Sequence, residues 1–150
     1  MKTEKKKAIL LLATLLALTF LSATVETPGE SEDGIHFFKG TWTEALEKSR
    51  NENKPIFLDV FATWCGPCKM LKRNTFSDKK VGDYFNTHYI NVSLDGEQAE
   101  GRRLMLKYNL RAYPSLVIVD GNENAKVIDA GYKSPGGLID FGKRGLQKLK

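Results

Sequence analysis

Short apolar runs alternate along this chain with longer segments in which apolar residues recur at helical spacing. The runs PIFLDVF (55–61) and SLVIVD (115–120) are almost wholly apolar, which is typical of strands buried on both faces of a sheet. IHFF (35–38) and YINVSL (89–94) are further candidates for strands. We therefore expect four strands up to residue 120, two of them central.

Capping residues mark where helices begin. Thr41 and Glu44 have the spacing of a capping box, which predicts a helix from there to about Asn53. Ser134 as N-cap, with Pro135 at the first helical position, predicts a last helix. The apolar face of that helix is formed by Leu138, Phe141, Leu146 and Leu149. Four glycines weaken it, namely Gly136, Gly137, Gly142 and Gly145.

A turn signal near the C-terminus predicts a hairpin. Asp120-Gly121-Asn122 leads from the strand at 115–120 into a further strand, AKVIDA (125–130). With helical segments after the two cysteines and at 99–109, the element order becomes β-α-β-α-α-β-α-β-β-α. This order predicts an α/β fold with a central mixed sheet flanked by helices, ending in an antiparallel hairpin and a helix.

The first residues have the layout of a secretory signal peptide. Four lysines come first, an uncharged apolar stretch follows, and small residues stand at Ser22 and Ala23. We expect cleavage near Ala23, which divides the chain into a signal peptide (1–23), a polar flexible tether (24–34) and one domain (35–150). The protein is then exported, to the periplasm.

An uncleaved N-terminal membrane anchor is the alternative. The uncharged stretch from Ala8 to Val25 reaches the lower limit for spanning a bilayer, although its serine and threonines weigh against that role. The leader also holds four lysines against one glutamate, so its removal lowers the formal net charge from +5 to +2. Lysine and glutamate are mixed along the rest of the chain, which gives nucleic-acid binding no support.

The stretch ATWCGPCKM (62–70) contains both cysteines of the chain, Cys65 and Cys68. A structural zinc site takes four ligands, usually Cys or His. The two histidines lie far from the motif along the chain, and we expect His36 in a strand and His88 in a loop or at a strand edge. The sequence therefore predicts no metal site.

The cysteine pair is better suited to redox chemistry than to haem attachment or structural bridging. Lys69 stands where a c-type haem motif needs histidine, and a bridge from Cys65 to Cys68 closes too short a loop to add much stability. A helix N-terminus favours a thiolate, so Cys65 is expected to be the exposed nucleophile and Cys68 the thiol that resolves the mixed disulfide. Gly66 lets a partner approach closely, and Pro67 lacks an N–H that the first turn does not need.

Two longer stretches make the family recognisable. FLDVFATWCGPCK (57–69) together with RAYPSLVIVD (111–120) resembles the thioredoxin family, over about residues 35–150. NTFSD (74–78) and the long segment that precedes the second stretch are more similar to the C-terminal domain of the bacterial transmembrane thiol–disulfide interchange protein. Both resemblances imply a thioredoxin fold and dithiol–disulfide exchange.

The resemblance implies a role for Asp59, which matches the family's buried acid beneath the second cysteine. Independently, a carboxyl inside an apolar strand is expected to have a raised pKa, and it could take the proton of Cys68 during resolution. The alternative is an aspartate that only bonds backbone at the end of a strand. The lysine that often pairs with this acid aligns with Asn91, so proton transfer through Asp59 stays an open question.

The resemblance also implies a substrate groove. Pro114 matches the family's cis-proline, which faces the disulfide and leaves neighbouring backbone free to pair with substrate. Trp64 matches an aromatic residue beside the active site, and Gly131 a small residue that flanks the groove.

The direction of electron flow follows from the same resemblance. Strong oxidants of this fold usually have a histidine where this chain has Pro67, and a large helical insertion for which there is no room here. We expect a monomeric reductant or disulfide reshuffler of the cell envelope, without a cofactor. Its partners are expected to be disulfide-containing envelope proteins and a membrane thiol transporter that supplies electrons. The alternative is a thioredoxin-like binding or stress module without turnover.

Overall fold

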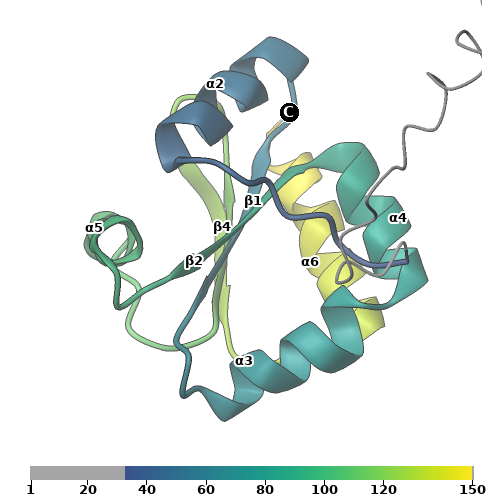
Figure 1. Cartoon of the computed structure of the whole chain (residues 1–150). Coiled ribbons are helices and arrows are strands. Elements are labelled where there is room, and N and C mark those ends of the chain that lie inside the picture. The colour runs from purple at the N-terminus through teal and green to yellow at the C-terminus, as the bar shows by residue number, and fades with distance from the viewer. Residues whose placement is uncertain (1–32, 150) are drawn as a thin grey trace, which may run out of the picture.

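The computed structural model describes residues 33–149, which form a mixed four-stranded sheet between two layers of helices (Figure 1). Strand β1 (Ile56–Phe61) pairs in parallel with β2 (Ile90–Asp95) and antiparallel with β3 (Ser115–Val119). Strand β4 (Ala125–Ala130) completes the predicted hairpin with β3. The order β2-β1-β3-β4 places β1 in the interior of the sheet, as its apolar sequence predicts.

The helices divide between the two faces of the sheet. One face is covered by α2 (Trp42–Glu52) and α5 (Ala99–Lys107), which pack on the even-numbered residues of β1 (Figure 1). The other face packs against the remaining helical elements, which are α3 (Gly66–Leu71), the π-helical turn η1 (Lys72–Phe76), α4 (Lys79–His88) and α6 (Pro135–Gln147). The predicted α/β class, with a terminal hairpin and helix, is confirmed.

Both predicted helix starts are confirmed. Thr41 caps α2 through a complete capping box with Glu44, because each side chain bonds the backbone N–H of the other residue. Ser134 accepts a hydrogen bond from the N–H of Gly137 at the start of α6, where Pro135 occupies the first position. These local bonds satisfy N–H groups that would otherwise lack partners in the first turn.

An aromatic cluster packs η1, α4 and α6 against β1. Phe57 of β1 is fully buried, and its ring contacts those of Phe76, Phe85 and Phe141 at centroid distances of 6.0, 4.6 and 6.4 Å. Truncation of such a phenylalanine costs about 3–5 kcal/mol. The sheet and three helical elements are thereby held together behind the active site.

Two glycines of α6 permit close packing rather than only weakening the helix. A Cβ atom at Gly145 would lie 2.1 Å from Cδ1 of Ile118, and one at Gly142 would lie 2.8 Å from the ring of Tyr84. A side chain at either position would displace these neighbours, so glycine lets α6 lie close to β3 and α4. Close helix approach therefore compensates for their low helix propensity.

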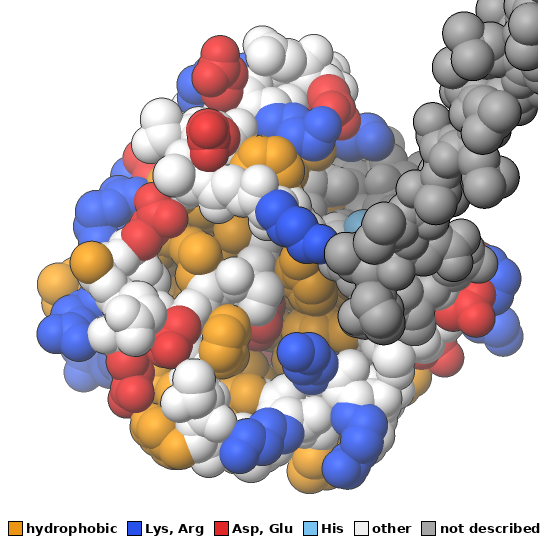
Figure 2. Space-filling model, in the orientation of Figure 1, with side chains coloured by type: hydrophobic (Ala, Val, Ile, Leu, Met, Phe, Trp, Pro, Cys, Tyr) orange, Lys and Arg blue, Asp and Glu red, His pale blue; other side chains and the backbone are white. Residues whose placement is uncertain are grey.

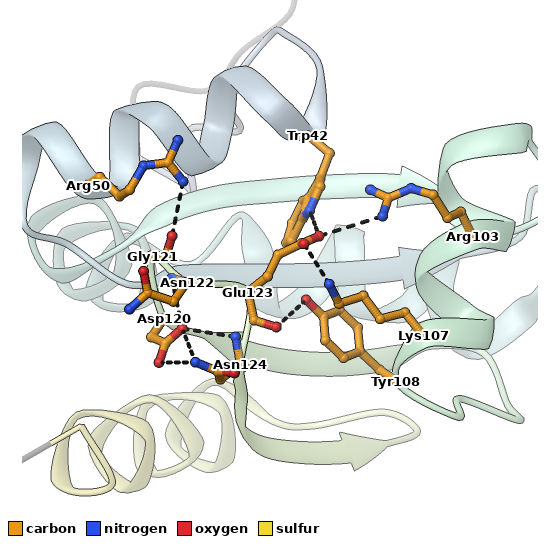
Figure 3. A network of polar contacts seen from close by, with 10 residues as sticks. All are labelled: Trp42, Arg50, Arg103, Lys107, Tyr108, Asp120, Gly121, Asn122, Glu123 and Asn124. Atoms are coloured by element: carbon orange, nitrogen blue, oxygen red, sulfur yellow. Dashed lines mark hydrogen bonds and ion pairs between the residues drawn. The ribbon is translucent and has the colours of Figure 1, made fainter.

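A polar network joins α2, α5 and the β3–β4 turn (Figure 3). The carboxylate of Glu123 accepts a hydrogen bond from the indole Nε1 of Trp42 at 2.5 Å and lies 2.5 Å from Nζ of Lys107. Arg103 adds an ion pair at 3.6 Å. Because β3 runs away from the cysteines, this network lies at the end of the sheet opposite the active site.

The predicted strand at 35–38 is wrong. This segment is extended, but its backbone N–H groups bond different elements: that of Ile35 donates to the carbonyl of Phe76, and that of Phe38 to the carbonyl of Asn91. The N–H of His36 donates to the side chain of Asn86 and not to a backbone carbonyl of a neighbouring strand. Bonds to three separate elements hold the segment in place without forming a ladder.

Two smaller expectations also need correction or lie outside the described residues. His36 is exposed in the extended segment rather than in a strand, and His88 is the last residue of α4, where its ring stacks on Tyr84. The signal peptide (1–23) and nearly all of the tether (24–34) lie outside residues 33–149. Within those residues no helix has the length and apolar character needed to cross a bilayer.

Candidate active site

The two cysteines lie at the N-terminal end of α3, shortly after β1 ends. Cys65 is the N-cap of α3 and forms a disulfide with Cys68 in its first turn, with their Cα atoms 5.3 Å apart. The backbone N–H of Cys68 also donates a hydrogen bond to Sγ of Cys65 at 3.1 Å. In the reduced protein the same N–H is positioned to stabilise a thiolate at Cys65.

Solvent exposure does not distinguish the two sulfurs in the way the sequence suggests. Cys65 was expected to be the exposed member of the pair, but only 3% of it is exposed, against 8% of Cys68. Both pack with Ala62 in a small apolar cluster against Tyr113. In the disulfide form the two cysteines therefore differ in the hydrogen bond that Sγ of Cys65 accepts, and hardly in their solvent exposure.

An exposed aromatic pair stands beside the disulfide. Trp64 is 65% exposed, and its ring meets that of Tyr113 edge-on at a centroid distance of 5.9 Å. The indole Nε1 donates a hydrogen bond to Glu97 at 2.9 Å, which holds the ring in place. Exposed aromatic surface with one anchored edge is typical of protein-binding sites.

The backbone next to this pair is open. The Tyr113–Pro114 peptide bond is cis, and the carbonyl of Pro114 accepts a hydrogen bond from the N–H of Gly131 at 2.8 Å. Gly131 has a φ of +85°, a conformation that favours glycine. No atom lies within 4 Å of where a Cβ would stand on Gly131 or Gly66. A partner chain can therefore approach the backbone at Gly131 and at Gly66, the residue that follows Cys65.

Asp59 lies on β1 beneath this surface and is 4% exposed. Burial raises the pKa of its carboxyl to about 7, although a hydrogen bond from Ser93 acts in the opposite direction. That bond joins the Ser93 hydroxyl to Oδ2 at 2.8 Å, while Oδ1 has no partner within residues 33–149. A carboxyl of this kind exchanges a proton near neutral pH.

The residue that faces Asp59 on the neighbouring strand is Ser93, not Asn91. The parallel register pairs Asp59 with Ser93 and places Asn91 opposite Phe57. The side chain of Asn91 instead donates to the carbonyl of His36 and to Asn86. Neither Ser93 nor Asn91 is charged, so Asp59 has no lysine opposite it on β2.

A cleft of about 380 Å³ connects Asp59 with Cys68. Ser93 also lines it, and its other walls are largely apolar, with Phe37 and Phe76 among them. Figure 2 shows hollows with apolar side chains at their floor on this face of the molecule. The cleft provides space for water, and so a route for a proton, between the second cysteine and the buried acid.

Sequence reasoning missed three side chains of this site. Ser93 could have been found from the parallel register of β1 and β2, and Tyr113 from its place next to Pro114. Nothing in the sequence around Glu97 signals its bond to Trp64. No group of three or more His, Cys, Asp or Glu side chains among residues 33–149 is arranged to hold a metal ion.

Comparisons with known proteins agree with this geometry. A family model described as thioredoxin-like matches residues 38–121. The solution structure of a putative disulphide-isomerase from Bacteroides thetaiotaomicron is 37% identical, with a TM-score of 0.69, and covers 79% of this chain and 98% of that one.

The chain is also similar to the thiol:disulfide interchange protein DsbD. The DsbD of Yersinia pestis is 34% identical over 74 residues, which are 49% of this chain but only 12% of that protein. The oxidised C-terminal domain of Neisseria meningitidis DsbD superposes with a TM-score of 0.61 at 20% identity, covering 73% of this chain and 99% of that one. At that identity the second likeness shows the fold alone.

Proposed function

The chain is a protein-disulfide oxidoreductase of the thioredoxin-like family, and from this premise we propose that it reduces or reshuffles disulfides of proteins in the cell envelope. The observation that supports this most is the hydrogen bond from the N–H of Cys68 to Sγ of Cys65. It provides the stabilised thiolate that dithiol chemistry needs at the first cysteine.

The proposed reaction has two exchange steps. The thiolate of Cys65 attacks one sulfur of a substrate disulfide, forms a mixed disulfide and releases the other substrate sulfur as a thiolate. Cys68 then loses its proton to Asp59 through the cleft and attacks Sγ of Cys65. The second substrate thiol leaves, and the protein retains both cysteines as the disulfide seen in the structure.

The proposed direction depends on the residue before the second cysteine and on the relatives. Pro67 stands where strong oxidants of this fold usually have histidine, and the printed title of the Bacteroides structure names a putative isomerase. The similarity to DsbD favours a membrane thiol transporter of that kind as the electron donor. Equilibration with glutathione tests the direction: we expect a potential closer to that of thioredoxin (about −270 mV) than to that of DsbA (about −120 mV).

The compartment and the substrates can be tested in cells. The basic and apolar leader favours export to the periplasm, so the N-terminus of the mature protein should lie near Thr24 in the soluble envelope fraction. An intact Met1 on membrane-bound protein would support the anchor instead. A Cys68→Ala variant should accumulate mixed disulfides with envelope proteins, and the matched Cys65→Ala, Cys68→Ala variant should accumulate none.

A further inference from the structure

Beyond the chemistry of the cysteines, the cleft beside them has a rim with an unbalanced charge. Two of its lining residues are exposed lysines, namely Lys69 on α3 and Lys72 at the start of η1. Arg73 follows on η1, and its guanidinium bonds only the neutral amide of Asn74. Among the described residues, none of these three cations has an acidic partner, so their charge is available to a bound molecule.

The nearby carboxylates on the adjoining strand end are already engaged. Glu97 accepts the indole N–H of Trp64, and Asp95 accepts the backbone N–H of Glu97. On this face basic side chains lie along the lower edge, whereas acidic and basic side chains are mixed at the left and the top (Figure 2). The basic rim therefore lies on α3 and η1, and no ion pair among the described residues neutralises it.

The interior of the cleft is suited to an apolar group. Phe37, Phe61 and Phe76 contribute most of its apolar wall, and the buried Oδ1 atom of Asp59 is unpartnered within residues 33–149. Apolar walls beneath a charged rim bind a side chain whose neighbours are of opposite charge. The cleft also reaches Cys68, so an occupant here would be continuous with a substrate whose disulfide meets Cys65.

The position of the cleft adds to the groove already described instead of repeating it. β2, which carries Ser93, and β3, which follows Pro114, lie on opposite sides of β1 in the sheet. The groove at Pro114 and Gly131 is therefore on one side of the cysteines and the cleft on the other. A protein substrate can therefore contact the groove and the cleft at the same time, on opposite sides of the cysteines.

We propose that the cleft docks an acidic segment of a protein partner, with one apolar side chain against the wall formed by Phe37 and Phe76, whose rings contact each other edge-on at 5.3 Å, and its neighbouring carboxylates on Lys69, Lys72 and Arg73. The proposal rests on the proposed function, because the partner is a substrate or electron donor that exchanges disulfides with Cys65. Opposite charge at such a rim mainly accelerates association and is weakened by salt.

The test compares four symmetric peptide disulfides as substrates of the reduced protein. Each peptide has one cysteine, followed by Glu-Phe-Glu, Ser-Phe-Ser, Lys-Phe-Lys or Glu-Ala-Glu. In each reaction one protein dithiol and one peptide disulfide yield one protein disulfide and two peptide thiols. Second-order rate constants are measured at low and at high salt for the wild type, Lys72→Glu and the matched control Lys148→Glu, which makes the same charge change on an exposed residue beyond the end of α6.

We expect the Glu-Phe-Glu peptide to react about fivefold or more faster than Ser-Phe-Ser at low salt, with the ratio falling towards one at high salt. Lys72→Glu lowers the charge of the rim from +3 to +1 and should therefore reduce the preference for Glu-Phe-Glu, and Lys148→Glu should keep it. Glu-Ala-Glu should be slower than Glu-Phe-Glu. Equal acidic and neutral rates in the wild type, or equal effects of the two variants, would overturn the proposal. Failure of every peptide, including the neutral one, would instead contradict the proposed function.

Discussion

The hydroxyl of Ser93 donates a hydrogen bond to Oδ2 of Asp59 at 2.8 Å, while the buried Oδ1 of the same carboxyl has no partner among residues 33–149. One hydrogen bond does not replace the hydration that a carboxylate has in water. The acid is therefore protonated far more readily than an exposed aspartate. Its position on the cleft shared with Cys68 makes it the proton acceptor in the proposed resolving step.

Replacement of Asp59 by asparagine should stabilise the oxidised protein in a pH-dependent way. The pKa of Asp59 is about 7 in the folded protein against an ordinary value of 3.8. Between these values the folded state binds more protons than the unfolded state, so the contribution of Asp59 to stability falls as pH rises from about 4 to 7 and is constant above. Asp59→Asn removes this loss.

Denaturant unfolding at pH 4, 6 and 8 measures the difference. We expect Asp59→Asn to be more stable by about 4 kcal/mol at pH 8, and nearly equal to the wild type at pH 4. Ser93→Ala is the matched control, since it removes the one bond that favours the charged carboxylate and should lower stability at pH 8. A pH-independent difference for Asp59→Asn would show that the carboxyl is hydrated.

The same substitution should slow one chemical step selectively. Without a carboxyl to accept the proton of Cys68, resolution of the mixed disulfide should slow by roughly 10–100-fold, as expected for loss of a general base. The first attack by Cys65 should change little. Stopped-flow fluorescence of Trp64, which lies beside the disulfide, reports both steps. Equal slowing of both would assign Asp59 a general structural role instead.

The two thiols of the reduced protein should differ in reactivity. Sγ of Cys65 accepts the N–H of Cys68 at the start of α3, whereas no hydrogen bond to the sulfur of Cys68 is present among the described residues. We expect iodoacetamide below pH 8 to modify Cys65 at least tenfold faster than Cys68, measured by peptide mapping of partly alkylated protein. A faster reaction at Cys68 would reverse the assigned roles.

The network around Glu123 should affect stability but not exchange. Glu123→Ala removes the acceptor of the Trp42 indole and the partner of Lys107, at a cost of about 1–2 kcal/mol. Glu123→Gln keeps an acceptor for the indole and should lose less. Because the network lies at the far end of the sheet, insulin reduction by the folded variants should match the wild type. A change in exchange rate in both variants would show coupling across the sheet.

The sequence predicted most of the fold because its local signals agree with the packing. The capping box at Thr41, the N-cap at Ser134, the buried runs of β1 and β3 and the turn at Asp120 are each set by residues close together in the sequence. The segment 35–38 was wrongly predicted as a strand because its apolar residues cover the core, as those of a strand do. Its backbone N–H groups, however, donate to three different elements. Hydrophobicity alone cannot distinguish such a segment from a strand.

The active site was predictable where its residues are adjacent in sequence and less so where they meet across strands. Cys65, Cys68 and their helix follow from one short motif. The partner of Asp59 depends on the register between β1 and β2, which pairs Asp59 with Ser93 and Phe57 with Asn91. The bond between Trp64 and Glu97 joins two loops, and no local pattern predicts it.

The central claim is that Cys65 and Cys68 catalyse dithiol–disulfide exchange, with Cys65 making the first attack. The most direct measurement is the turbidity that develops as dithiothreitol reduces insulin, with and without the protein. The wild type should shorten the lag several-fold, and Cys65→Ala, folded to the same degree by circular dichroism, should leave the lag as in buffer. A wild-type protein that gives no acceleration would contradict the claim and identify a thioredoxin-like binding module without turnover.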